Sequence, residues 1–128
     1  MKADFEASKP IYVQIADQIF QRIVREEIKP GDKLPSVREM AIQLGVNPNT
    51  IQRSYTEMER MGVVETRRGQ GTFVIEKESM VEELQQTMQK EIILQFVKSM
   101  EELGFSKKEM ISGLEAFLNE GDQNGDPV

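Results

Sequence analysis

The residues best suited to a chemical role are amide and guanidinium side chains grouped between residues 47 and 56. Asparagine and glutamine can bind adenine through two hydrogen bonds, and arginine can bind guanine or hold a phosphate. Asn47 and Pro48 are typical of the first residues of a helix, whose apolar positions recur on one side. The opposite side of this predicted helix carries Asn49, Thr50, Gln52, Arg53 and Thr56. The pattern predicts a helix that reads base edges in the major groove of DNA.

Basic and small residues flank this helix on both sides. The preceding predicted helix begins near a lysine, a serine and an arginine, a common place for contacts to phosphate. After the helix, two arginines and two glycines form a short basic turn that can approach a phosphate backbone or a minor groove closely. The candidate DNA-binding residues are therefore Lys33, Ser36, Arg38, Asn47, Asn49, Thr50, Gln52, Arg53, Arg67, Arg68, Gly69 and Gly71.

Three helices and a hairpin must position these residues. Helical periodicity predicts a first helix from Pro10 to about Ile28, a second from the cap Ser36 to Gly45, and a third over 48–62. β-Branched residues predict strands over 63–67 and 72–75, joined by a hairpin turn. A helix, a helix-turn-helix and a two-stranded hairpin make a winged helix. The predicted fold class is mostly α: an α+β winged helix-turn-helix with a C-terminal two-helix dimerisation appendage.

The second half of the chain differs in its apolar pattern. After Ser79, apolar residues at steps of three or four predict a long helix that ends at Gly104. A capping box formed by Ser106 and Glu109 then begins a short final helix. Two helices cannot enclose a core, so their apolar side must pack on the winged helix, on a second copy of the chain, or on both. The candidate dimerisation residues are Leu84, Met88, Ile92, Phe96, Met100, Leu114 and Phe117.

These patterns divide the chain into three regions. The winged helix-turn-helix DNA-binding domain occupies residues 8–76, the helical dimerisation region 77–120, and a flexible tail 121–128. A self-complementary two-fold contact is the commonest way for such an appendage to bury its apolar side. We therefore expect a homodimer.

Composition excludes most enzyme chemistry. The 128 residues include no cysteine and no histidine, so thiol and imidazole catalysis and the usual zinc sites are excluded. Adjacent acids such as Glu82 and Glu83 diverge along a helix and form no catalytic pair. We predict no enzyme activity, no metal and no cofactor.

The net charge of −6 is unevenly distributed. Residues 1–75 hold 11 basic and 10 acidic residues, whereas residues 76–128 hold 5 and 12. The acidity of the whole chain therefore does not argue against DNA binding by its first part. No apolar run approaches the roughly 20 residues that span a bilayer, and residues 1–5 lack the apolar stretch of a signal peptide. We expect a cytoplasmic protein with no membrane partner.

Each feature also has a purely structural interpretation. Asn47 and Pro48 are compatible with a simple helix start, Arg67 and Arg68 with a solvated turn, and Arg38 with a surface ion pair to Glu39 or Glu57. The eight methionines suit core and dimer packing. A winged helix can also act as a protein–protein adaptor without specific DNA readout. The order of tight turn, capped polar helix and basic hairpin favours DNA.

Four segments resemble motifs of GntR-family bacterial transcription regulators. They are PIYVQI at 10–15, LPSVREMA at 34–41, LGVNPNTI at 44–51 and RGQGTFV at 68–74. The resemblance implies a winged helix over about residues 8–75. Many relatives carry an arginine where this chain has Pro48, so we expect Gln52 and Arg53 to take over base reading, or the operator to differ. By the family pattern, the DNA-contacting positions are Ser36, Arg38, Asn49, Thr50, Arg68 and Gly69.

The 53 residues after the winged helix are too few for the large partner domains of other GntR members. They resemble the short helical tail of the YtrA-like subfamily. That resemblance implies a homodimeric repressor of an inverted-repeat operator, in a group that often controls an ABC-transporter operon together with its own gene. The sequence identifies no small-molecule effector: a pocket at the dimer interface, a membrane-linked signal and control by protein level all remain open.

Overall fold

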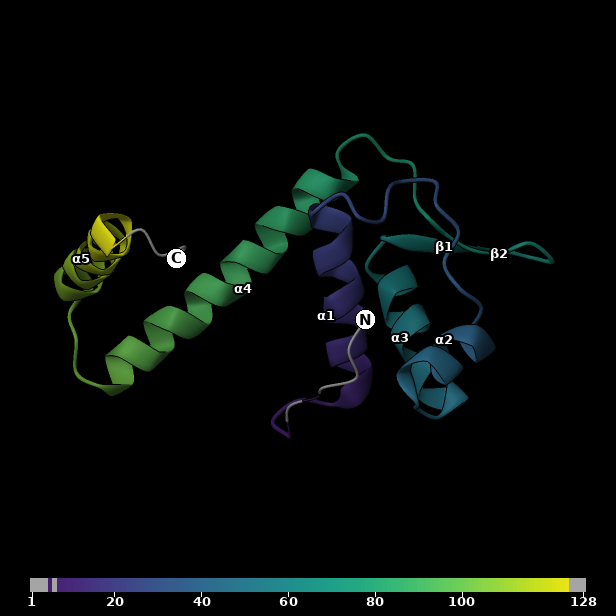
Figure 1. Cartoon of the computed structure of the whole chain (residues 1–128), viewed down its shortest axis with the longest axis horizontal. Coiled ribbons are helices and arrows are strands. Elements are labelled where there is room, and N and C mark those ends of the chain that lie inside the picture. The colour runs from purple at the N-terminus through teal and green to yellow at the C-terminus, as the bar shows by residue number, and fades with distance from the viewer. Residues whose placement is uncertain (1–4, 6, 125–128) are drawn as a thin grey trace. The chain divides into compact units, whose positions relative to one another are not determined.

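The computed structural model describes residue 5 and residues 7–124 (Figure 1). Two compact units, residues 1–86 and 87–128, meet within one helix. Three helices and a hairpin are followed by two more helices, so the predicted fold class is confirmed. In chain order the elements are α1 (Ile11–Val24), α2 (Val37–Leu44), α3 (Pro48–Arg60), β1 (Val64–Arg67), β2 (Gly71–Val74), α4 (Met80–Glu102) and α5 (Lys107–Asn124).

Helix α3 lies at the centre of the winged helix and contacts α1, α2 and β1. One side of α3 is buried, and its residues there are Ile51, Ser54, Tyr55 and Met58. The Ser54 hydroxyl lies 2.8 Å from the carbonyl oxygen of Tyr12 in α1, which satisfies a polar group inside the core. Apolar residues from α1, α2 and the sheet complete this core, among them Ile15, Ile19, Ile23, Met40, Val64 and Val74.

Helix α1 ends at Val24, four residues before the predicted end near Ile28. The N–H of Glu27 donates to the carbonyl of Arg22 at 2.8 Å, and the N–H of Glu26 donates to that of Ile23 at 3.0 Å. These two bonds form a Schellman motif, with Glu26 in the left-handed region at φ 64°. The prediction of this end was wrong because a glutamate stands where glycine usually marks such an end.

Helices α2 and α3 form the predicted helix-turn-helix. Ser36 Oγ accepts from the N–H of Glu39 at 3.1 Å, and Glu39 Oε1 accepts from the N–H of Ser36 at 3.0 Å. The hydrogen bond from the Ser36 backbone N–H to the Glu39 carboxylate is the main cause that lowers the pKa of this carboxyl. Gly45 ends α2 at φ 66°, and Asn47 Oδ1 begins α3 by accepting from the N–H of Asn49 at 2.8 Å. The predicted capping roles of Ser36, Gly45 and Asn47 are confirmed.

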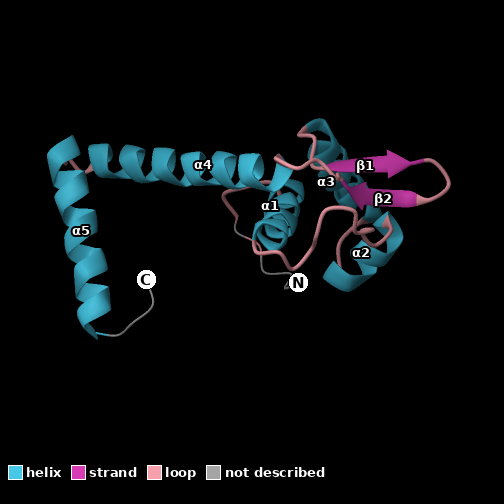
Figure 2. Cartoon of the chain, turned by 90° about the horizontal axis from the view of Figure 1, so that it is seen from above, coloured by secondary structure: helices cyan, strands magenta, loops and turns pink. Residues whose placement is uncertain are grey.

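The hairpin of β1, β2 and the turn 68–70 is called the wing below (Figure 2). Val64 lies opposite Val74 and Arg67 opposite Gly71. The first strand begins one residue later than predicted and ends at Arg67 as predicted, and the second lies one residue earlier than predicted. Residues 31–34 pair with the other edge of β2: for example, the N–H of Leu34 donates to the Thr72 carbonyl at 2.8 Å. This segment before α2 therefore runs along the outer edge of β2, with a bridge between Lys33 and Phe73.

Helices α4 and α5 are both present as predicted, and α5 is longer than predicted at its C-terminal end. The N–H of Phe105 donates to the carbonyl of Met100 at 3.0 Å around Gly104, and the Ser106–Glu109 capping box is present. Helix α5 continues through residues 121–124, which were predicted as flexible tail, so Gly121 does not end it. Residues 125–128 of that tail lie outside the described residues. Among the described helices, none has the length and apolar character that crossing a membrane requires.

The predicted dimerisation residues fall into three groups by burial. Leu84 is buried within the single chain, together with Met80, so it belongs to the protomer core rather than to a free surface. Met88, Phe96 and Met100 are half-buried. The large apolar side chains left exposed on and between α4 and α5 are Ile92, Ile93, Leu94, Leu103, Phe105, Ile111, Leu114, Phe117 and Leu118.

Candidate nucleic-acid interface

The polar side of α3 is exposed, as predicted. Asn49, Gln52, Arg53 and Thr56 are all exposed, and Thr50 is half-buried. Gln52 Nε2 donates to Thr56 Oγ1 at 3.3 Å, one helical turn later. Because the opposite side of α3 is fixed in the core, these polar groups face solvent and are free to meet a ligand.

Arg53 is held by a neighbouring helix. Its guanidinium carbon lies 4.1 Å from the centroid of the Tyr12 ring, which belongs to α1. An aromatic face attracts a cation at this distance. Arg53 therefore lies at the border between α3 and α1, where its exposed guanidinium is oriented before any ligand binds.

The surface ion pairs considered for Arg38 are absent. Glu57 instead binds Arg60, whose Nε donates to Glu57 Oε2 at 3.0 Å, and this hydrogen bond lowers the pKa of the Glu57 carboxyl. Glu39 is occupied by the cap of α2. Within the described part of the chain, no acidic group pairs with Arg38, so its exposed charge is available at the start of α2.

The two arginines of the wing have different surroundings. The Arg67 guanidinium lies 4.2 Å from the centroid of the Phe73 ring, and its Nη2 lies 2.9 Å from Glu65 Oε1. Arg68 is exposed in the turn beside Gly69 and forms no ion pair with any residue that the structure describes. Arg67 therefore supports the hairpin, whereas Arg68 presents its charge outward.

The end of the Lys33 side chain lies beside Gly71, next to the turn of the wing. A Cβ on Gly71, whose φ is +121°, would lie only 2.7 Å from Lys33 Cε. The positive φ favours glycine at this position, whereas the lysine end is flexible and would move aside for a larger residue. The absence of a side chain at Gly71 leaves room for the end of the Lys33 side chain.

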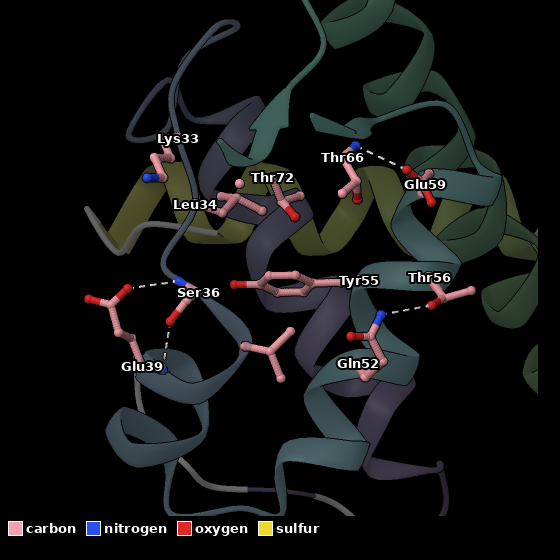
Figure 3. Close-up of a pocket in the computed structure, with 12 residues that line it drawn as sticks. Lys33, Leu34, Ser36, Glu39, Gln52, Tyr55, Thr56, Glu59, Thr66 and Thr72 are labelled. Carbon is pink, nitrogen blue, oxygen red and sulfur yellow. Dashed lines mark hydrogen bonds between the residues drawn. The ribbon is translucent and has the colours of Figure 1, made fainter. Parts of the chain in front are cut away.

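A groove of about 330 Å³ lies between α2, α3 and the wing (Figure 3). The Tyr55 hydroxyl at its wall donates to the carbonyl of Pro35 at 2.7 Å, and burial raises the pKa of this tyrosine. Glu59 Oε2 accepts from the N–H of Thr66 at 3.0 Å. The lining residues are Lys33, Leu34, Ser36, Val37, Glu39, Gln52, Tyr55, Thr56, Glu59, Thr66, Gly71 and Thr72.

The groove unites some of the predicted site residues and adds others. Four predicted residues from three segments meet there: Lys33 and Ser36 before α2, Gln52 in α3 and Gly71 in the wing. The others lie outside its lining, on α2, α3 and the wing turn: Arg38, Asn47, Asn49, Thr50, Arg53, Arg67, Arg68 and Gly69. Sequence reasoning missed Glu59 and Thr66. Glu59 follows Gln52 by seven residues and so shares its helical face, which is the one signal that could have found it.

The fold and this surface define the winged-helix class of DNA-binding proteins. Residues 11–74 match the model of the family described as bacterial regulatory proteins, gntR family. The chain is 62% identical over 121 residues to the HTH-type transcriptional regulator YhcF of Bacillus subtilis, a match that covers 94% of this chain and 100% of YhcF. It is 44% identical over 99 residues to the HTH-type transcriptional repressor YtrA of the same organism, covering 76% of this chain and 75% of YtrA. The chain belongs to the GntR family and to its YtrA-like group, and it is a DNA-binding transcriptional regulator, not an enzyme.

Solved structures agree with this assignment. A GntR family transcriptional regulator from Listeria monocytogenes matches with a TM-score of 0.78 and 40% identity, over 88% of this chain and 98% of that chain. The DNA-binding domain of AraR, solved in complex with operator ORX1, matches with a TM-score of 0.53 and 28% identity, over 58% of this chain and 94% of that chain. The first likeness extends well beyond the winged helix, and the second concerns little more than half of the chain.

Proposed function

We propose that this chain is a homodimeric repressor that binds an inverted-repeat operator. The observation that carries the proposal is the exposed polar side of α3, with Asn49, Gln52 and Arg53, on a helix whose other side is buried. In each protomer α3 enters a major groove and the wing lies beside it. The AraR domain, which resembles the winged helix, is bound to an operator in its structure and supports this mode of binding.

The proposed contacts fall into two classes. Lys33, Ser36, Arg38 and Arg68 hold phosphates, because they are exposed and lie on the segments that flank α3. Gly69 and Gly71 let the wing backbone approach DNA closely, and Arg67 keeps the wing in shape. Asn47 uses its oxygen to cap α3 and has its amide nitrogen left for a phosphate. Base readers are taken from the outer side of α3: Asn49, Thr50, Gln52 and Arg53.

The dimer contact is assigned to α4 and α5. Ile92, Leu114 and Phe117 are exposed, with 69%, 45% and 61% of their surfaces accessible. Neighbouring apolar residues on both helices are exposed as well, and a patch of this kind marks an interaction surface. A second copy of the chain covers such a patch by a two-fold contact and places two reading heads on one DNA duplex. Half-sites are then expected about one helical turn, roughly 10 bp, apart.

The resemblance to the YtrA-like group extends the proposal to repression and to the target. YtrA is described as a repressor, and bound operator next to a promoter would block transcription. Members of this group often control an ABC-transporter operon and their own gene, and we propose the same target for this chain. DNA of this kind lies in the bacterial cytoplasm, where we place the protein. A search for the selected operator upstream of transporter genes tests this part.

The decisive experiment is selection of bound duplexes from a random DNA pool at two salt concentrations. Enrichment of an inverted repeat is expected, and the fall of affinity with salt counts the phosphate contacts. Enrichment of a single unrepeated site would reject the dimeric mode. No enrichment by a folded dimer would reject specific DNA readout and favour the protein–protein adaptor.

Single substitutions separate the two contact classes. Arg38→Ala should weaken binding to all sequences alike, whereas Gln52→Ala should change the preference at particular bases by about 1–3 kcal/mol. Gln43 is exposed on α2 and outside the groove, so Gln43→Ala is the matched control for Gln52→Ala. An equal loss on every operator variant would contradict base reading by Gln52.

A further inference from the structure

The two outer edges of the wing are held in different ways. On the β2 side, residues 31–34 form a series of backbone hydrogen bonds, including Leu34 N–H to the Thr72 carbonyl and Val74 N–H to the Asp32 carbonyl, both at 2.8 Å. In an antiparallel pair, alternate residues turn their backbone groups toward or away from the partner strand. Thr72 turns away from β1, so Thr66 opposite it turns its N–H away from β2. That N–H lies at the free edge of the sheet.

Glu59 supplies the partner for this edge. Its Oε2 accepts from the Thr66 N–H at 3.0 Å, and Glu59 stands in the last turn of α3. The bond joins the helix proposed to enter the major groove directly to a strand of the wing. Both residues also line the groove between α3 and the wing (Figure 3).

The negative charge of Glu59 is unfavourable on a surface proposed to bind DNA, so its presence needs a structural reason. An exposed carboxylate on a surface that meets phosphates repels them and weakens association. Glu59 shares its helical face with Gln52, one of the proposed base readers. Among the described residues, the hydrogen bond of its side chain goes to the wing and not to its own helix. The hydrogen bond to Thr66 explains why a carboxylate stands at this position.

We propose that Glu59 is a positioning residue that fixes the wing relative to α3 and thereby sets how both fit one stretch of DNA. The inference rests on the proposed function, and it adds a residue that touches no base or phosphate. The proposal depends on the Glu59–Thr66 hydrogen bond, which forms without DNA and can be tested in the free protein.

The first test measures exchange of the Thr66 amide hydrogen by NMR in the free protein. Glu59→Ala should speed this exchange about threefold to tenfold, since the amide loses its acceptor, while Glu59→Gln keeps an oxygen acceptor and should stay near the original rate. Glu57→Ala is the matched control, because it removes the same charge from the same helix without touching the wing. Core amides must keep their rates, which excludes general destabilisation. An unchanged Thr66 rate in Glu59→Ala overturns the proposal.

The second test measures affinity for the selected operator. Glu59→Ala should lower affinity about threefold to tenfold, with footprint protection lost on the wing side, and Glu59→Gln should preserve both. If both variants raise affinity equally, Glu59 acts only through its charge and the proposal fails. If both change the preference at one cytosine, Glu59 reads a base and positioning is again overturned. If no DNA is bound at all, the proposed function fails. The exchange measurement still shows whether Glu59 holds the Thr66 N–H.

Discussion

The two units of the chain share the same local signals and differ in what they bury. Helix α2 in the first unit and helix α5 in the second both begin with a serine–glutamate capping box, at Ser36 and Ser106. Only the first unit encloses a core: Ile51 in α3 is fully buried, whereas Ile92 in α4 is 69% exposed. The comparison teaches that capping decides where a helix begins, while burial decides whether a unit is complete by itself. On the proposal made above, a second copy of the chain covers the apolar side chains that the second unit leaves exposed.

The largest expected effect comes from removing the second unit. A chain truncated after Gln86 retains Met80 and Leu84, which are buried, so the winged helix should still unfold cooperatively. Its operator affinity should fall by at least about 100-fold, because two reading heads are no longer linked. Circular dichroism melts and DNA titrations measure both quantities. Undiminished affinity would contradict the proposed dimerisation role of the second unit.

The next effect contrasts the same substitution in the two units. Ile51→Ala opens a cavity in the closed core and should lower the free energy of unfolding by about 2–5 kcal/mol. Ile92→Ala should leave the unfolding of the winged helix unchanged and weaken self-association. Denaturant titration and sedimentation at several concentrations distinguish the two. Equal loss of stability from both substitutions would show that Ile92 supports the protomer rather than the dimer.

A smaller effect concerns the two capping boxes. Ser36→Ala and Ser106→Ala each remove one cap and should each cost about 1 kcal/mol. The loss should appear in the unfolding of the winged helix for Ser36, and in self-association for Ser106. Because Ser36 is also a proposed phosphate contact, Ser36→Thr serves as the control that keeps the cap. A stability loss shared equally by both readouts would contradict the independence of the units.

The smallest effect is a dependence on pH. Hydrogen bonds from the serine of each box lower the pKa of Glu39 and Glu109 in the folded chain. A lowered folded pKa means that the stabilisation is present above the ordinary glutamate pKa and is lost as the pH falls through the folded value. Glu39→Gln should therefore flatten the acid side of the stability curve of the truncated chain. Identical curves between pH 7 and pH 3 would contradict this assignment.

The elements were predictable from sequence wherever a local signal marked their ends. The caps at Ser36 and Asn47 and the glycines at 45 and 104 placed four helix ends correctly. The end of α1 was missed because Glu26 takes a conformation that glycine usually signals. The wing and its order after the helix-turn-helix followed from β-branched residues and a glycine-rich turn.

Contacts between elements could not be read from local patterns. The stacking of Arg53 on Tyr12 joins residues 41 positions apart, and nothing in their spacing indicates it. Arg67 and Arg68 look alike in the sequence, yet only Arg67 lies against Phe73. The acceptor role of Glu59 depends on which way Thr66 turns its N–H, and this follows from strand register. Register and packing are properties of the folded unit.

The division of α3 into a buried and an exposed side has an evolutionary consequence. The fold depends on Ile51, Ser54, Tyr55 and Met58, whereas the outer residues contribute little to the core. Mutations on the outer side therefore escape the selection that maintains folding. After a gene duplication, one copy can acquire a different target sequence through a few substitutions on this side and keep its scaffold. A lineage can in this way build a set of regulators that share one architecture and do not compete for each other's operators.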